Sequence, residues 1–514
     1  MIIRHEVGVP GLKRVLILLL ILLPASLICL SCGTTPSSRT QTSGLKYRAF
    51  ITNSVSAGTT SAGIVIVNAE TDVHPVITPI SAGATPEMMV VTPNRAQTLV
   101  FSGNGTQFSD NQLSLINNAS ESASAHVTLP GMTASFVVSP DSSTAYVALP
   151  TAPSAGQSPG VVEVIALNSG SVTATISCPP GNPTTPVCVS TDANLQGVNP
   201  AFNYLSIGNT GNRLLAFNQG SGQNFDSIAN VVDVITPSSS GTANPVVTLV
   251  PGFDHPVWAY FNSDDSTAYV LNCGPECGGT QASIQPLDLT TNPPTPGTAV
   301  AVPAATVALV VNSSTMYLAG TPYSGGVPSQ ACQPAQTTAA TSCGVLTIFD
   351  LNTMSVVQPP VQPPYCATGK QCPIIITDGY HTGMALSANG QLFIGANTCT
   401  EIFPPIPPAG AEVRGCLSIY NTLTTAVGNA QPGGVLIPPA NGDVTGIQPI
   451  AKRGDGLAQE VVYVIQGHGL LQGGSLYIYD VTIDALEYNP NDPKNPGQIN
   501  GLVGNFFDVK AVDF

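Results

Sequence analysis

Residues 136–148 read FVVSPDSSTAYVA, which is an apolar run, a polar turn and a second apolar run. This pattern predicts a β-hairpin, because Pro, Asp and Ser favour tight turns whereas Val, Tyr and Phe favour strands. The pattern recurs at 259–272 as AYFNSDDSTAYVLN. A hairpin that recurs in this way indicates an internal repeat.

Eight segments match the second strand of this hairpin. They are 47–53, 97–103, 144–150, 212–218, 267–273, 315–321, 391–397 and 461–467. A third strand with alternating apolar residues follows each of them. These third strands are 63–71, 111–118, 160–168, 230–237, 282–290, 344–352, 415–423 and 474–482. A weaker fourth strand follows in some units, as at 171–179 and 244–250.

Small four-stranded sheets cannot bury both faces alone, and stacking them around an axis solves this problem. We therefore predict an all-β fold, a β-propeller of four-stranded antiparallel blades. The repeat count gives eight blades, or seven if a degenerate unit near 178–212 or after 456 is an insertion. The final segment NFFDVKAVDF (505–514) fits the strand missing before 47–53. We expect it to pair with the first blade and close the ring.

The repeat resembles the YVTN-type propeller repeat of bacterial, lactonase-like propellers, which has a Ser-Pro-Asp-Gly turn, a Tyr-Val strand and a Val-x-Val-Ile-Asp strand. The best copies are 136–148, 259–272 and 344–353. The resemblance covers nearly all of 45–514 and implies architecture, not activity. Most copies lack the full turn motif, and Pro286 lies inside one expected strand. A single Trp and no Trp-Asp pair argue against a WD40 repeat.

The amino-acid composition argues against several classes of function and structure. The 514 residues include 14 Lys+Arg and 29 Asp+Glu, a net charge of -15. A nucleic-acid partner is therefore not expected, because phosphate binding needs a basic surface. With 50 Gly and 46 Pro the chain is a poor helix former, and 43% hydrophobic residues argue against disorder.

The N-terminus has the pattern of an export signal. Basic residues within 1–14 precede the apolar run VLILLLILLPASLICL at 15–30. The sequence Ser31-Cys32-Gly33 resembles a lipobox, although Cys29 stands where Leu is usual, and it predicts lipidation of Cys32. Ordinary cleavage near Ser31 and an uncleaved signal anchor are the alternatives. We expect a signal peptide at 1–31, a polar tether at 32–44 and the propeller at 45–514.

The protein is thus expected to be exported and held at a membrane through its N-terminal lipid or signal anchor, facing the periplasm or the cell surface. Its other ten cysteines form sequence-local couples, which suits an oxidising compartment. The couples are Cys178/Cys188, Cys273/Cys277, Cys332/Cys343, Cys366/Cys372 and Cys399/Cys416. Disulfides fit better than zinc, because no CxxC occurs among these ten cysteines and no His lies within a couple.

Two long connections, 322–343 and 398–416, both join a second strand to a third strand. They should emerge on one face of the ring, which is then a candidate surface for partner contact. The alternative is loop expansion without function, because surface loops tolerate insertions.

Polar residues precede or begin several first strands, which line the axis of a propeller. They are Glu87, Asn199, Asp254 with His255, Asp378 with His381, Asp443, and Asn505 with Asp508. Carboxylates and imidazoles are suitable ligands for a divalent metal, so a site at the axial mouth is one interpretation. The resemblance to lactonase-like propellers implies acidic and His groups at that mouth. Solvated turn residues are the other interpretation.

No H-E-x-x-H motif and no phosphate-binding loop occurs. We therefore expect a cell-envelope propeller that acts as a non-catalytic binding or scaffolding module without a required cofactor. An envelope protein or a polysaccharide is the expected partner. The alternatives are a lactonase-like hydrolase that uses the axial residues and a structural surface-layer component, because the fold alone does not choose among them.

Overall fold

A computed structural model gives the structure of the chain, which divides into two compact units, Met1–Thr40 and Gln41–Phe514. The first unit lies outside the described residues. The structure describes residues 42–54, 62–103, 111–151, 160–177, 188–190, 201–218, 231–237, 246–330, 342–363, 366, 372–399, 416–426, 431–436, 442–450, 460–467, 474–482, 485–486, 497, 499, 502 and 504–513.

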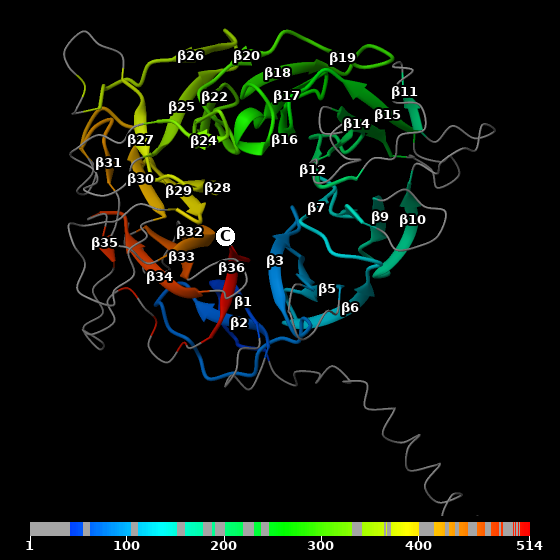
Figure 1. Cartoon of the computed structure of the whole chain (residues 1–514). Coiled ribbons are helices and arrows are strands. Elements are labelled where there is room, and N and C mark those ends of the chain that lie inside the picture. The colour runs from blue at the N-terminus through cyan, green and yellow to red at the C-terminus, as the bar shows by residue number, and fades with distance from the viewer. Residues whose placement is uncertain are drawn as a thin grey trace, which may run out of the picture. The chain divides into compact units, whose positions relative to one another are not determined.

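The second unit is built from β-sheets arranged around an axis (Figure 1). Seven of them are four-stranded antiparallel blades. Three blades comprise β3 (Pro86–Val91), β4 (Gln97–Ser102), β5 (Gln112–Asn117) and β6 (Ser122–Thr128); β7 (Ser135–Val138), β8 (Thr144–Leu149), β9 (Val161–Ala166) and β10 (Ser171–Ile176); and β12 (Tyr204–Ile207), β13 (Leu214–Phe217), β14 (Val231–Thr236) and β15 (Val246–Pro251), with β11 (Cys188–Ser190) parallel to β15.

The remaining four blades follow in chain order. Two have a divided outer strand: β16 (Pro256–Phe261), β17 (Thr267–Asn272), β18 (Ser283–Asp288), β19 (Thr295–Pro296) and β20 (Val300–Ala301); and β21 (Val307–Val311), β22 (Thr315–Gly320), β25 (Gly344–Asp350), β26 (Ser355–Val357) and β27 (Ile374–Ile376). The last two are β28 (Tyr380–Leu386), β29 (Gln391–Asn397), β30 (Leu417–Asn421) and β31 (Val435–Leu436); and β32 (Asp443–Ile450), β33 (Val461–Gly467), β34 (Gly474–Asp480) and β35 (Ala485–Leu486).

The two ends of the second unit close the ring together. Strand β36 (Phe506–Ala511) pairs antiparallel with β1 (Arg48–Asn53), and β1 pairs with β2 (Gly63–Asn68). Ala49 lies opposite Ala511, which confirms that the last segment completes the first sheet. At the outer position of this sheet only isolated bridges occur among the described residues. The eight predicted repeats therefore appear as seven four-stranded blades and a three-stranded closing sheet.

The inner strands form the wall of the ring. Each inner strand contacts the next one around the axis, in the order β36, β3, β7, β12, β16, β21, β28 and β32. Strand β32 in turn contacts β36, which closes the ring. All eight predicted second strands are confirmed as strands. Pro286 is accommodated in β18 because the outer strand is interrupted opposite it, where a proline cannot donate a ladder hydrogen bond.

The hydrophobic core is divided among the junctions between neighbouring sheets. In β13, Leu214 and Ala216 pack toward the preceding blade, whereas Leu215 and Phe217 pack toward the following blade. This follows from the alternation of side chains along a strand. Each fully buried Leu or Phe contributes about 1.5–3 kcal/mol, so every sheet depends on both of its neighbours.

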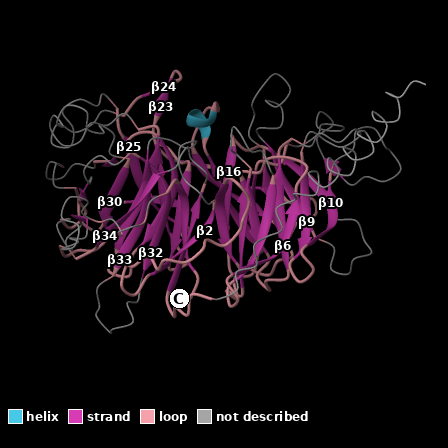
Figure 2. Ribbon diagram, turned by 90° about the horizontal axis from the view of Figure 1, so that it is seen from below, coloured by secondary structure: helices cyan, strands magenta, loops and turns pink. Residues whose placement is uncertain are grey.

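Each inner strand begins at the same end of the ring, which we call the mouth face. Among the described connections from second to third strands, the 3-10 helix η2 (Gly274–Cys277) and the hairpin of β23 (Tyr323–Ser324) and β24 (Val327–Pro328) lie there (Figure 2). The opposite end, which carries the turns between first and second strands, is the turn face.

Carboxylates on the turn face tie neighbouring blades together. Asp265 accepts hydrogen bonds from the backbone N–H groups of Asn209 and Thr210, both at 2.8 Å, in the preceding blade. The carboxylate of Glu460 likewise accepts hydrogen bonds from the backbone N–H groups of Ala388 and Asn389, at 2.6 and 3.1 Å, in the preceding blade. Such charge-assisted bonds satisfy turn donors and fix the position of one blade against the next.

Arg48 links neighbouring sheets through its side chain at the point where the ring closes. Its Nη2 lies 2.6 Å from Oδ1 of Asp513 and its Nε lies 2.8 Å from Oδ2 of the same residue. Its Nη1 donates to Oε1 of Glu121 at 3.0 Å and to the carbonyl of Asn118 at 2.6 Å. Arg48 is buried, and it joins the first and last strands to the β5–β6 turn.

A buried carboxyl in β14 should make stability depend on pH. Asp233 is fully buried and accepts a 2.7 Å bond from Nδ2 of Asn218, and its Oδ1 has no partner among the described residues. Burial raises the pKa of Asp233 to about 8, far above its ordinary value of 3.8. The folded protein therefore keeps this proton at pH 7, although the unfolded chain releases it.

We expect Asp233→Asn to remove this dependence. Because the folded pKa is raised, the contribution of Asp233 to stability is fully present below about pH 4 and is lost as the pH rises toward about 8. Between pH 4 and pH 8 the free energy of unfolding of the variant should gain about 3–5 kcal/mol relative to wild type. Urea unfolding at both values measures this gain. Parallel pH profiles for the two proteins would contradict the prediction, and Asp264→Asn, at an exposed carboxylate, is the control.

Among the described residues, no helix has the length and hydropathy needed to cross a bilayer.

Candidate functional site

A cavity of about 640 Å³ lies on the axis at the mouth face. The first residues of the inner strands provide most of its wall. The lining residues are Glu87, Met88, Ala134, Tyr204, Val257, Trp258, Thr306, Val307, Ala308, Tyr380, His381, Thr382, Asn397, Thr445, Phe507 and Asp508. Its size and its mostly apolar wall with a few polar groups are typical of a small-molecule site.

The structure brings together three of the sequence-predicted axial residues, Glu87, His381 and Asp508, on the wall of this cavity. Asp254, His255, Asp378 and Asp443 lie on the mouth face outside the lining. Asn505 binds the first sheet, because its N–H donates to Oδ1 of Asn53 at 2.8 Å. Asn199 lies outside the described residues.

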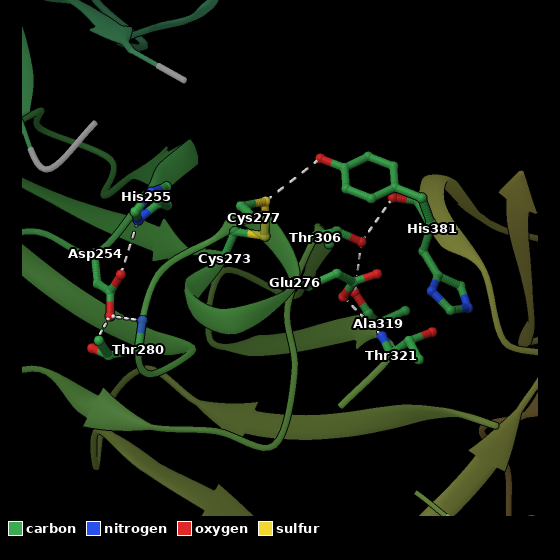
Figure 3. Close-up of a disulfide and its surroundings, with 11 residues drawn as sticks. Asp254, His255, Cys273, Glu276, Cys277, Thr280, Thr306, Ala319, Thr321 and His381 are labelled. Atoms are coloured by element: carbon green, nitrogen blue, oxygen red, sulfur yellow. Dashed lines mark hydrogen bonds and ion pairs between the residues drawn. A yellow bond between two sulfur atoms is a disulfide. The ribbon is translucent and has the colours of Figure 1, made fainter. Parts of the chain in front are cut away.

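Asp254 and His255 hold the connection between η2 and β18. Oδ2 of Asp254 accepts bonds from N and Oγ1 of Thr280, at 2.9 and 2.6 Å (Figure 3). It also accepts a bond from N of Gln281 at 2.7 Å. Its Oδ1 lies 3.1 Å from Nδ1 of His255. Burial alone would raise the pKa of Asp254, but these bonds outweigh it and lower the pKa. A Cβ on Gly279 would lie 1.8 Å from Oδ1, so only glycine fits there.

His381 is buried between two blades. Its side chain has no exposed surface, and its Nε2 donates to the carbonyl of Thr377 at 3.0 Å. Its own carbonyl accepts a 2.9 Å bond from Oγ1 of Thr306. Burial lowers the pKa of His381 to about 4, so the imidazole is neutral at pH 7. The residue therefore joins β28 to the start of β21.

Asp443 and Asp508 also accept bonds from the backbone. Oδ1 of Asp443 accepts from N of Thr398 at 2.9 Å. Oδ2 of Asp508 accepts from N of Met89 at 2.9 Å, and its Oδ1 pairs with Nζ of Lys510 at 2.9 Å. Asp508 thus ties the closing strand β36 to β3.

The structure does not gather the predicted axial residues into a three-ligand group. Among the described residues, three potential metal ligands come together only at Cys399, Cys416 and Asp443. The two cysteines form a disulfide there, so their sulfur atoms are not free thiolates. The divalent-metal interpretation therefore has no ligand set in the described part of the chain.

Three predicted disulfides are confirmed: Cys273–Cys277, Cys366–Cys372 and Cys399–Cys416. Cys343 is also in a disulfide, and its predicted partner Cys332 lies outside the described residues. Cys178 lies outside them too, so the couple with Cys188 stays a prediction.

Sequence reasoning missed one acidic residue at the mouth, Glu276 of η2. Its Oε2 accepts a 2.9 Å bond from N of Thr321, and burial raises its pKa to about 8 (Figure 3). Burial and the nearby charges of Glu276 and Asp378 raise the pKa of Tyr323 as well. The sequence signal was an acidic residue inside the short disulfide loop CGPEC at 273–277.

The structure describes part of one long connection, 322–343, and only the ends of the other, Thr398, Cys399 and Cys416, so the expectation that both emerge on one face stays a prediction. The β23–β24 hairpin belongs to the connection 322–343 and contacts η2 on the mouth face (Figure 2). The segments 331–341 and 400–415 lie outside the described residues. The mouth face therefore combines the cavity with elaborated connections.

The cavity wall has a distinct chemistry. Four aromatic side chains reach it from four inner strands, namely Tyr204, Trp258, Tyr380 and Phe507. Trp258 is the only tryptophan of the chain. Glu87 and Asp508 are carboxylates, and none of the lining residues that the structure describes is Lys or Arg. Such a wall can bind an apolar body through the rings and a polar group through the carboxylates.

Several solved structures resemble this chain. Dihydro-heme d1 dehydrogenase NirN, in complex with DHE, matches with a TM-score of 0.52 and 11% identity over 94% of this chain and 78% of that one. The periplasmic gluconolactonase PpgL of Pseudomonas aeruginosa has a TM-score of 0.40 and 11% identity over 90% and 98% of the two chains. A candidate 6-phosphogluconolactonase from Bacteroides uniformis has a TM-score of 0.43 and 11% identity over 76% and 95%.

No family model and no curated protein matches this chain. At 11% identity, the similarity to the NirN structure shows a common fold and says nothing of activity. The chain is therefore described by its architecture, a β-propeller closed by its last strand.

Proposed function

We propose that this protein is an exported, non-catalytic binding module of the cell envelope, and that it binds a small organic ligand in the cavity at its mouth face. The observation that carries the proposal is the cavity itself, which is about 640 Å³ in volume and has aromatic residues on its wall together with polar groups. Cavities of this size and polarity are the usual sites of small ligands.

The proposal includes the cellular location of the protein. The basic and apolar N-terminal segment favours export, and the motif around Cys32 favours lipidation. Disulfides support an oxidising compartment outside the cytoplasm. The YVTN-type assignment rests on the sequence motifs at 136–148, 259–272 and 344–353.

The chemistry of the axial residues favours binding over hydrolysis. Asp254, Asp443 and Asp508 accept hydrogen bonds from backbone N–H groups, and His381 donates to a carbonyl. These groups stabilise the mouth, whereas a hydrolase would need some of them to reach a substrate. The hydrolase alternative is supported by fold alone.

Binding can be measured with the neutral probe N-phenyl-1-naphthylamine, which fluoresces in apolar surroundings. Because Trp258 lies on the cavity wall, bound probe should accept excitation energy from it, and the signal should saturate at one probe per chain. Ala134 is exposed and also lines the cavity, so Ala134→Phe should narrow the cavity without disturbing the core. We expect the affinity of the Ala134→Phe variant for the probe to be at least about tenfold lower than that of the wild-type protein.

Ala119→Phe is the matched control, because Ala119 is exposed in the β5–β6 turn, away from the cavity. Its affinity should equal that of the wild-type protein. If the probe does not saturate, or if Ala134→Phe binds it as well as wild type does, the cavity is not a ligand site.

A further inference from the structure

We infer that the ligand of the mouth-face cavity is a neutral ring compound that carries an O–H or N–H donor at one edge, as a phenol does. This inference rests on the proposed function, because it names the class of ligand for the same site. Three observations support it: β-bulges in the inner strands, an unequal distribution of polar groups around the wall, and buried oxygen atoms without a hydrogen-bond partner.

Five of the eight inner strands contain a β-bulge near the mouth face, namely β3, β16, β28, β32 and β36. In β28, Thr382 is the extra residue, because His381 and Gly383 pair with consecutive residues of β29. A bulge changes the direction of a side chain and is frequent beside binding sites. All residues inside the bulges line the cavity: Glu87, Met88, Val257, Thr382, Thr445, Phe507 and Asp508. The bulges therefore shape the wall of this cavity.

Polar side chains are concentrated on one half of the wall. Strands β28, β32, β36 and β3 follow one another around the axis, and all four are bulged (Figure 1). Together with the end of β29 they form the half that we call the polar half. Its polar side chains are Glu87, His381, Thr382, Asn397, Thr445 and Asp508.

The opposite half of the wall, from β7, β12, β16 and β21, is mostly apolar. Ala134, Val257, Trp258, Val307 and Ala308 belong to it. Its polar groups are the hydroxyls of Tyr204 and Thr306, and that of Thr306 already donates to the carbonyl of His381 at 2.9 Å. A ligand that fills the cavity therefore meets an apolar surface on one side and polar groups on the other.

Two side-chain oxygens of the polar half have no hydrogen-bond partner among the described residues. They are Oδ1 of Asn397 and Oγ1 of Thr445, and both atoms are buried. An amide oxygen can only accept, and a buried acceptor without a partner costs free energy. Thr382 is exposed and adds a further hydroxyl to the same half. A ligand with an O–H or N–H donor can supply the missing partner, whereas a ligand with acceptors alone cannot.

The wall favours a neutral ligand with a flat apolar body. No described residue of the wall is Lys or Arg, so an anion would be buried there without a cation, which is costly. The carboxylate of Asp508 already pairs with Nζ of Lys510 at 2.9 Å. On the apolar half, Tyr204 and Trp258 offer aromatic side chains against which a ring can pack. A ring with a donor at one edge thus fits both halves at once.

Three compounds with the same body separate the ligand classes: 4-propylphenol, 4-propylanisole and 4-propylbenzoate. The first offers an O–H donor, the second only an acceptor and the third a negative charge. Each is titrated by calorimetry at pH 7 into the wild-type protein, with and without bound N-phenyl-1-naphthylamine, and binding that this probe suppresses is binding in the cavity. We expect 4-propylphenol to bind about five- to tenfold more tightly than 4-propylanisole, and 4-propylbenzoate to bind most weakly.

Thr445→Val should lower the affinity for 4-propylphenol about fivefold and leave that for 4-propylanisole unchanged. Valine has nearly the shape of threonine, and the hydroxyl it removes has no partner in the free protein, so the free energy of unfolding should not fall. The matched control is Thr347→Val. Thr347 lies in β25, outside the cavity wall, and its Oγ1 is also buried without a partner among the described residues. This control should change neither affinity.

The outcomes distinguish this inference from the proposed function. If N-phenyl-1-naphthylamine binds but 4-propylphenol binds in the cavity no better than 4-propylanisole or 4-propylbenzoate, the ligand class is wrong and the binding function stands. The same holds if Thr445→Val and Thr347→Val have equal affinities for 4-propylphenol. If neither N-phenyl-1-naphthylamine nor any of the three compounds binds, both proposals fail.

Discussion

Replacing Arg48 with Met should lower the free energy of unfolding by about 3–5 kcal/mol. Arg48 binds Asp513 through two nitrogens and Glu121 through a third, and the arginine side chain is 11% exposed. Methionine keeps most of the apolar stem but leaves both carboxylates without their cation. Breaking a buried ion pair in this way is strongly destabilising, because the remaining charges stay out of water.

The effect is measured by urea unfolding at pH 7. Arg213→Met is the matched control, because Arg213 is a partly exposed arginine on the same face and its side chain donates to Thr236 at 3.2 Å. Its loss should change the free energy of unfolding by less than about 1 kcal/mol. Equal losses for the two variants would show that Arg48 does not close the ring.

A chain that ends at Leu502 should fail to form the closed ring. The deletion removes β36, and with it the strand pairing to β1, the buried side chains of Phe506, Val509 and Ala511, and the link from Asp508 to Met89. Burial of those apolar side chains contributes several kcal/mol, comparable with the whole stability of a domain. We expect loss of the near-UV circular dichroism of the aromatic residues and a larger hydrodynamic radius.

Rescue in trans tests whether the missing strand is the cause. A synthetic peptide of residues 503–514 should bind the shortened chain by adding a strand to the edge of β1 and should restore the near-UV signal. The same peptide with Val509→Asp is the control, because Val509 is fully buried and a carboxylate there is unfavourable. A shortened chain that keeps the native signal without any peptide would contradict the prediction.

Much of the fold was predictable because the strand pattern is local. The segment TAYVALP (144–150) alternates the residues that face the two neighbouring blades, and β8 has that alternation in the structure. The closing strand was predictable because 505–514 supplies the strand missing from the first repeat. The closing sheet has three strands and not four, since the outer position has only isolated bridges at Val73 and Ile80.

The candidate site was harder to predict. Equivalent positions in repeats lie at the same height on the ring, but they are spread around its circumference. His255 and His381 precede or begin inner strands of blades that have another blade between them, so their similar register does not bring them together. The aromatic residues of the wall were not recognised, because Trp258 and Tyr204 look like ordinary strand residues in the sequence.

The position of β36 has a consequence for biosynthesis. Its partner β1 leaves the ribosome more than four hundred residues earlier, so the nascent chain holds an unpaired strand edge throughout translation. Closure of the ring therefore waits until the synthesis of the chain is nearly complete. For the whole of that period the unfinished protein stays accessible to chaperones and proteases.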